Sequence, residues 1–292
     1  MRSFLSLATA LSLALATTVL AATACNGNTA LCSRLYSNVS LVGAHNSAFV
    51  GELPQQNQYI SVKDQLDIGV RYLQAQTQEF LGQIRMCHTS CLLLDQGDLE
   101  DYLTPIKSWI DSHPNDVVTL LLTNPDAIPV SEYGAVFTKV GLDQYAFTPS
   151  TTLALSQWPT LQSMINAGTR LVVFMDYHSD TTAVPYILDE FSYYFETPYD
   201  TTDASFPQCT LDRPAGAAAG GRMFIMNHML DVEILGIKVP NRLEAPTTNS
   251  ENSILAQADL CASLYGRVPN VVLLDYIDKG NAIAAQNALN NV

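Results

Sequence analysis

The chain is poor in positive charge, and it has no glycine-rich phosphate loop after any candidate strand. It carries 14 Lys and Arg against 28 Asp and Glu, a formal net charge of −14. Such a surface repels polyanions, which argues against DNA or RNA as a partner and against strong attraction to anionic membranes. The missing phosphate loop disfavours an open, doubly wound nucleotide-binding sheet.

The first 24 residues have the pattern of a secretory signal peptide. A single charge at Arg2 precedes an apolar run that Ser, Thr and Ala interrupt, and the segment ends in Ala22-x-Ala24. The run is too short for a comfortable membrane span, and the C-terminal residues lack the apolar tail of a lipid-anchor signal. We therefore expect residues 1–24 to be cleaved and residues 25–292 to form one secreted, extracellular domain.

Six cysteines follow the predicted cleavage site, an even number that suits an oxidising compartment. Several pairings are open to them, and we expect the local ones: Cys25–Cys32, Cys87–Cys91 and Cys209–Cys261. Zinc is the alternative for Cys87 and Cys91, but no second cysteine pair lies nearby in the sequence. Their spacing also differs from the CxxC of thioredoxin-like redox sites.

Short apolar runs rich in β-branched residues alternate with amphipathic segments along the chain. The apolar runs are 38–45, 70–77, 83–88, 116–124, 170–178, 192–199, 222–229 and 270–278. Helical spacing is found at 62–69, 99–113, 184–191 and 253–266, and Ser61 and Asp98 are candidate N-caps. The pattern predicts an α/β fold, a single (β/α)8 TIM barrel that need be neither regular nor fully closed. The run 192–199 also fits the end of a helix.

Most of the apolar runs change to polar residues at their last positions, which in such barrels is the end where chemistry takes place. The polar residues at these ends are His45, Asn46, Gln74, Gln76, His88, Asn124, Asp176, His178, Glu196, Asn227, His228, Asp275 and Asp278. His45 and His88 could form an acid–base pair, because imidazole titrates near neutrality. The alternative is that each is a hydrogen-bonded structural histidine.

The motifs VGAHNSAF, QLDIGVRYLQAQT, MCHTSC, LEDYL, VVTLLLTN, VVFMDYHSD, YILDEF and VVLLDYID together resemble a known family. They are similar to the catalytic domain of phosphatidylinositol-specific phospholipase C, and more narrowly to the secreted, fungal-type PLC-like phosphodiesterases. The resemblance runs from about residue 38 to 280. It implies a TIM barrel that cleaves a phosphodiester.

The resemblance also implies roles for individual residues. His45 would be the general base that deprotonates the inositol 2-hydroxyl, and His88 the general acid that protonates the departing diacylglycerol oxygen. Asp275 would orient His45 and stabilise its charged form. Residues expected to contact the substrate are Asn46, Gln74, Gln76, Asp176 and Asn227.

The chain departs from the family where positive charge is needed. Bacterial relatives carry an arginine near the end of the second strand and calcium-dependent ones carry acidic ligands there, whereas this chain has Gln74 and Gln76. Asn46 stands where bacterial relatives have Asp. Alternation predicts that Arg71 points away from the barrel interior. No cofactor is firmly implied, and calcium would lack its usual acidic ligands.

These departures keep several interpretations open. The main one is a secreted phosphoric diester hydrolase or lyase acting on a phospholipid or small phosphodiester, a monomer that contacts the membrane surface at most transiently. The alternative is a weakened or inactive barrel that binds a phospho-headgroup or glycan. Asp176 and Glu196 could instead serve a metal or a glycosidase. Asn38 is a candidate glycosylation site in an N-x-S sequon.

Overall fold

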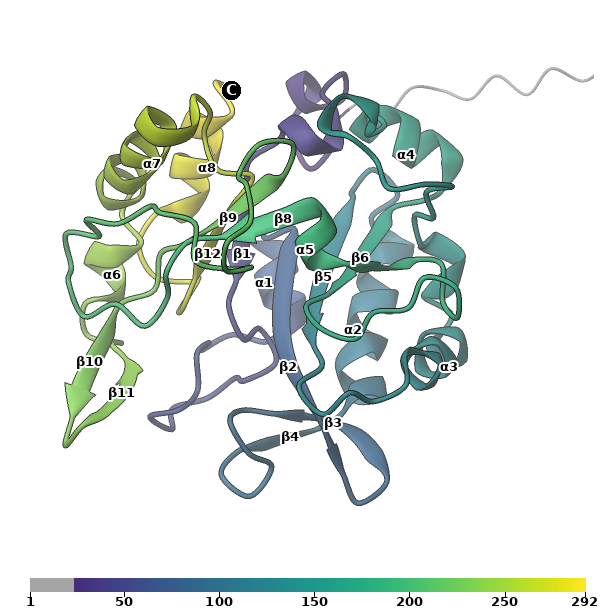
Figure 1. Ribbon diagram of the computed structural model, residues 1–292, viewed down its shortest axis with the longest axis horizontal. Helices are drawn as coiled ribbons and strands as arrows, with labels where there is room; N and C mark the ends of the chain where they lie inside the picture. Colours follow the sequence, from purple (N-terminus) through teal and green to yellow (C-terminus); the bar gives the residue numbers. More distant parts are fainter. Residues whose placement is uncertain (1–23) are drawn as a thin grey trace, which may run out of the picture.

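The computed structural model describes residues 24–292, so the predicted signal peptide lies almost wholly outside the described residues (Figure 1). Eight parallel strands form the main sheet: β1 Leu41–Ala44, β2 Tyr72–Phe80, β5 Val118–Thr123, β6 Leu171–Met175, β7 Ile187–Asp189, β8 Tyr194–Glu196, β9 Met223–Asn227 and β12 Val271–Leu274. Their hydrogen-bonded order is β7-β6-β5-β2-β1-β12-β9-β8. Chain order therefore runs once around the sheet, as in a TIM barrel.

The helices cover the outside of this sheet (Figure 1). They are α1 Val62–Asp67, α2 Leu99–Ser112, α3 Val130–Val140, α4 Leu161–Ala167, α5 Glu190–Tyr193, α6 Ala245–Thr248, α7 Glu251–Tyr265 and α8 Ala282–Leu289, with 3₁₀ helices η1 Thr29–Leu31, η2 Tyr36–Asn38, η3 Asp143–Tyr145 and η4 Leu155–Gln157. Ser61 caps α1, as expected, by accepting a hydrogen bond from the Asp64 N–H. None of the helices described is long and apolar enough to cross a membrane.

The predicted α/β barrel fold is confirmed, and the barrel is incompletely closed. Within residues 24–292 no strand pairing joins β7 to β8, the two ends of the sheet. The short helix α5 connects these two strands directly. Its first residue, Glu190, therefore lies at the open seam of the barrel.

Two predicted elements are wrong, but the barrel still has eight strands, because one predicted barrel strand is absent and one predicted helix is a strand. Residues 83–88 are not a barrel strand, because β3 (Gln83–Cys87) turns back antiparallel along the far half of β2 and then pairs with β4 (Asp95–Asp98). Residues 184–191 are not a helix, because β7 forms there and pairs with β6. The long β2 extends beyond the barrel, so its exposed half needs a partner of its own, which β3 supplies.

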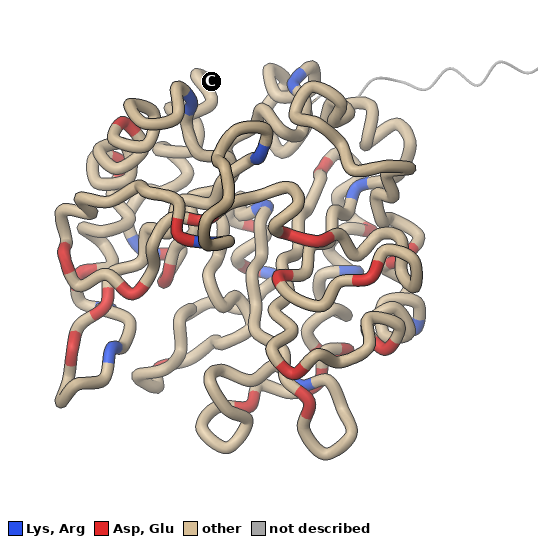
Figure 2. Tube along the Cα trace, in the orientation of Figure 1, with Lys and Arg blue, Asp and Glu red and all other residues tan. Residues whose placement is uncertain are grey.

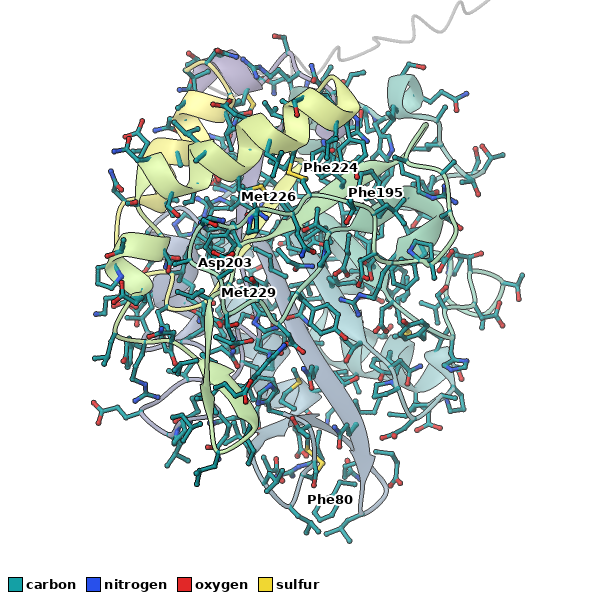
Figure 3. The ribbon with its side chains drawn as sticks, turned by 60° about the vertical axis from the view of Figure 1, so that its left-hand side comes forward. Phe80, Phe195, Asp203, Phe224, Met226 and Met229 are labelled. Atoms are coloured by element: carbon teal, nitrogen blue, oxygen red, sulfur yellow. A yellow bond between two sulfur atoms is a disulfide. The ribbon has the colours of Figure 1, made fainter. Side chains whose placement is uncertain are left out.

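Alternation along each strand sorts the core into two parts. Side chains facing inward pack together inside the barrel, and they include Leu41, Tyr72, Leu121, Phe174, Leu188, Tyr194, Ile225 and Leu273. Their neighbours face the helices, as Phe195 and Phe224 do, whose stacked rings lie 5.1 Å apart (Figure 3). The predicted orientation of Arg71 is confirmed, since it pairs with Asp116 at 2.9 Å beneath the helical layer.

All three expected disulfides are present: Cys25–Cys32, Cys87–Cys91 and Cys209–Cys261. Because these bonds use all the cysteines of the described chain, the zinc alternative for Cys87 and Cys91 is wrong. The Cys87–Cys91 bond closes a small ring around His88. The Cys209–Cys261 bond ties the loop before β9 to α7.

We expect the two internal disulfides to stabilise the fold unequally, since a cross-link removes more entropy from the unfolded chain when it closes a longer loop. The separations are 52 residues for Cys209–Cys261 and 4 for Cys87–Cys91. Replacing Cys209 and Cys261 by Ser should lower the free energy of unfolding by about 4 kcal/mol, and replacing Cys87 and Cys91 by about 2 kcal/mol. Urea unfolding measures both losses, and equal losses would contradict the expectation.

Candidate active site

Each barrel strand aims one polar side chain into a single cavity. In each strand every second residue faces inward. Beyond the apolar core, the next inward-facing positions are His45, Gln74, Thr123, Asp176, Glu190, Glu196, Asn227 and Asp275. All of these residues line one cavity of about 400 Å³. The cavity lies at the carboxyl ends of the strands, where TIM-barrel active sites are found.

His45 and Asp275 form a hydrogen-bonded pair at the ends of neighbouring strands. The backbone register of β1 and β12 places them side by side, and His45 Nδ1 lies 2.8 Å from Asp275 Oδ1. Asn57 donates to the same carboxylate oxygen at 2.9 Å. Because the carboxylate accepts a hydrogen bond from Nδ1–H, the Nε2 of His45 is free to act as a base.

His88 lines the same cavity from the end of β3. Burial, together with the nearby imidazole of His45, lowers the pKa of His88 to about 4. Its ring packs against Phe49, with centroids 5.2 Å apart. Its Nδ1 is buried and has no hydrogen-bond partner in the described part of the chain.

Gln74 and Gln76 brace the two histidine loops. The side-chain oxygen of Gln74 accepts a hydrogen bond from the N–H of Asn46, at 2.7 Å. That of Gln76 accepts one from the N–H of Thr89, at 3.2 Å. Each glutamine thus holds the residue that follows a histidine of the pair. Both glutamines are therefore neutral braces for the backbone of these loops.

Arg213 brings positive charge to the opposite wall of the cavity. It lies in the loop between β8 and β9 and is anchored to Glu196 by backbone hydrogen bonds and by a 2.5 Å contact from Nη2 to the carboxylate. Asn227 donates to the same carboxylate at 3.0 Å. The charge of Glu196 raises the pKa of Arg213 against the opposing effect of burial, so the guanidinium is a permanent cation.

Three cavity carboxyls have raised pKa values because they are buried. Burial raises the pKa of Asp176 to about 6, even though the N–H groups of Asn124 and Tyr177 donate to it. Burial and the nearby Asp275 raise the pKa of Asp231 to about 6. Glu190 is fully buried at the seam, and burial and the charge of Glu196 raise its pKa well above the usual range.

Most of the expected site residues meet in this cavity, but some do not. It is lined by the expected His45, His88, Asp275, Gln74, Gln76, Asp176 and Asn227. The side chain of Asn46 is fully buried outside the cavity, so its position does not support the expected substrate contact. His228 is also buried elsewhere, where it contacts Gln257 and Thr248 as a structural histidine.

Five further residues of the cavity were not predicted from the sequence: Glu190, Thr123, Asn57, Arg213 and Lys238. Glu190 was missed because the short β7 has helix-like spacing. Thr123 would have been found by the two-residue period, which excludes the neighbouring Asn124. Arg213 lies in an irregular loop, where no local pattern indicates which way a side chain points.

Comparison with known proteins identifies the family. The PI-PLC X 1 family model matches residues 31–290, so the chain belongs to the PI-PLC X domain family. It is 52% identical over 273 residues to PI-PLC X domain-containing protein 1 of Arthroderma benhamiae, covering 92% of this chain and 90% of that protein. It is 42% identical to a protein named "Uncharacterized secreted protein" from the same organism, covering 92% of this chain and 64% of that protein.

Solved structures agree on the fold. Phosphatidylinositol-specific phospholipase C from Listeria monocytogenes superimposes with a TM-score of 0.58 at 15% identity, covering 89% of this chain and 95% of that one. A mutant of the Staphylococcus aureus enzyme gives 0.55 at 12% identity, covering 89% and 94%. At such low identity the likeness establishes the barrel fold and not the activity.

We expect the imidazole of His88 to titrate near pH 4, far below the pKa of an imidazole in solution. The reasons are that the side chain is buried and that the imidazole of His45 lies nearby. Inorganic phosphate between the rings should raise this pKa, since an anion stabilises the charged form. NMR titration measures both effects, with His88→Ala to assign the signal. His113, which stacks on Trp109 outside the cavity, should not respond to phosphate. Titration of His88 at an ordinary pKa without phosphate would contradict the expectation.

Proposed function

We propose that this protein is a secreted phosphodiesterase that cleaves an inositol phospholipid, or a closely related phosphodiester, by acid–base catalysis between two histidines. The observation that carries the proposal is the hydrogen-bonded His45–Asp275 pair in one cavity with His88. Membership of the PI-PLC X domain family supports the reaction class. The three disulfides and the relative named as secreted support an extracellular location. We propose further that the protein acts as a monomer.

In the proposed reaction, Nε2 of His45 removes the proton from the inositol 2-hydroxyl. That oxygen attacks the adjacent phosphorus, and the bond from phosphorus to the diacylglycerol oxygen breaks. His88 gives its proton to the departing oxygen. The products are a 1,2-cyclic inositol phosphate and diacylglycerol, and Asp275 stabilises the imidazolium formed on His45.

Substrate binding would itself prepare His88 for this role. A general acid must be protonated, yet burial and the nearby His45 lower the pKa of His88 to about 4. A phosphodiester anion placed between the rings replaces repulsion with attraction and raises that pKa. The free protein would therefore hold a neutral His88, and substrate binding would lead His88 to take up a proton from solvent.

The remaining walls suit a polyhydroxyl ring. Carboxylate and amide groups at Asp176, Glu196 and Asn227 can exchange hydrogen bonds with ring hydroxyls. Arg213 supplies the positive charge that Gln74 and Gln76 do not, because its guanidinium has five donors and Nη2 alone donates to Glu196 in the described structure. Neutral or partly protonated carboxyls at Glu190 and Asp176 lessen repulsion of the phosphate.

We expect His45→Ala and His88→Ala each to lower the release of soluble inositol phosphate from labelled phosphatidylinositol on the order of 10³-fold or more, since each removes half of the acid–base pair. The wild type should yield the cyclic phosphate first. His228→Gln is the matched control, because this histidine lies outside the cavity. The turnover of this variant should be nearly unchanged. Equal rates for wild type and His45→Ala would refute the proposal.

Arg213→Met should lower kcat/KM on the order of 10² to 10³-fold, the usual cost of losing one charged donor. Arg85→Met is the control, because that guanidinium pairs with Asp95 and Asp98 outside the cavity. Adding Glu196→Gln to Arg213→Met should restore any lost thermal stability without restoring turnover. Full activity of Arg213→Met would show that the positive charge comes from elsewhere.

A non-catalytic headgroup binder is the second candidate, and the engagement of Gln74 and Gln76 as neutral braces favours it. Such a protein would bind phosphoinositol saturably without turnover. His88→Ala would then leave the affinity unchanged. Reliable release of inositol phosphate by the wild type would eliminate this candidate.

A further inference from the structure

His88 is held in the cavity by a different part of the fold than His45. His45 follows a barrel strand, and the register of β1 with β12 places it beside Asp275. His88 follows β3, which pairs antiparallel with β2 and β4 in a hairpin that projects from the barrel (Figure 1). The register of the barrel therefore does not by itself fix where His88 lies.

A disulfide bond spans His88 instead. Cys87 and Cys91 enclose three residues, of which His88 is the first, and their Cα atoms lie 4.8 Å apart. Because four residues of extended chain can reach about 13 Å, the bond requires the chain to double back directly after His88. The N–H of Ser90 donates to the carbonyl of His88 at 2.6 Å within this turn. The ring contains no Lys, Arg, Asp or Glu, so no ion pair between such residues inside it fixes the turn (Figure 2).

Thr89, the next residue in the ring, has a backbone conformation that its own side chain disfavours. Its φ is 63°, in the left-handed region, where a β-branched residue is a genuine outlier. Such a conformation persists only where the surrounding structure imposes it. Two contacts impose it here: the disulfide that spans Thr89, and the side chain of Gln76, which accepts a hydrogen bond from the Thr89 N–H at 3.2 Å. Both act on the residue that follows His88.

The direction of the His88 side chain depends on this turn. Its ring packs against Phe49 and lines the cavity. The ionisable groups that face it are His45, which lowers its pKa, and Asp275, which raises it. An open turn would let the ring leave Phe49 and reach water, away from the space between the two histidines.

We propose that the Cys87–Cys91 disulfide is a positioning device, which holds Thr89 in its left-handed conformation and thereby directs His88 toward the leaving group. This inference rests on the proposed function, in which His88 is the general acid. The second hairpin at the cavity, β10 (Asp231–Ile234) with β11 (Ile237–Pro240), lines it without containing a cysteine. The cross-link is thus specific to the hairpin that carries a histidine of the pair.

The test compares two disulfides, and it uses release of soluble inositol phosphate from phosphatidylinositol. Cys87→Ser with Cys91→Ser should lower kcat on the order of 10²-fold, the cost of misplacing a reacting group by about 1 Å. KM should change little, because the other cavity walls still bind the substrate. Equal kcat values for this variant and the wild type would overturn the inference.

Cys209→Ser with Cys261→Ser is the matched control. This bond closes a loop of 52 residues and neither cysteine lines the cavity, so its loss should lower the stability more and leave kcat unchanged. The assay is run at a temperature at which circular dichroism shows both variants folded. A fall in kcat of equal size in both variants would overturn the inference, because general loosening of the fold would then explain it.

NMR titration of His88 gives a readout that does not depend on turnover. Burial and His45 lower the pKa of His88 to about 4. In the Cys87→Ser, Cys91→Ser variant the ring gains access to water, so its pKa should rise toward the ordinary value of about 6.5, whereas it should stay near 4 in the control variant. A pKa near 4 in both variants would overturn the inference. If the wild type releases no inositol phosphate, the proposed function fails, and the titration still decides whether the disulfide positions His88.

Discussion

The two-residue period of the β-strand is the constraint on which the site depends. It fills the inside of the barrel with apolar side chains, and two residues later it delivers a polar side chain from each strand to one cavity. A slip of one residue in any strand would exchange these polar groups with residues that face the helices. The hydrophobic core thus fixes the geometry of the cavity, and His45 meets Asp275 because β1 and β12 share one register.

The proposed function divides backbone positioning and positive charge between different parts of the cavity. Gln74 and Gln76 hold the backbone beside each histidine, which is a mechanical role that a neutral amide performs well. In the proposed function the charge comes instead from Arg213, across the cavity, which pairs with Glu196, and Asn227 donates to the same carboxylate. In this proposal the glutamines of β2 position the backbone, and Arg213 in the loop between β8 and β9 supplies the positive charge.

The parts of this protein that could be predicted from its sequence are those with local causes. The apolar runs gave the barrel, and their last residues gave His45 and Asp275. His88 was placed correctly at the rim but on the wrong kind of strand, because nothing local distinguishes a hairpin arm from a barrel strand of equal length. Arg213 could not be found in this way, since its direction depends on a contact with Glu196 that is distant in sequence. Glu190 could not be predicted either, because its position depends on the pairing of β7 with β6, and no local pattern in the sequence indicates that pairing.

The open seam has an electrostatic consequence. Glu190 lies at the gap between β7 and β8, where it is buried near Glu196 and Arg213. Arg213 pairs with Glu196 and stabilises its carboxylate, whereas burial keeps Glu190 neutral. On the far side, burial and His45 keep His88 neutral as well. Burial thus keeps one ionisable group neutral on each side of the cavity, Glu190 and His88, although six carboxyls line it. In the proposed reaction, a bound phosphodiester would complete this balance, because its negative charge would allow His88 to hold the proton that it gives to the leaving oxygen.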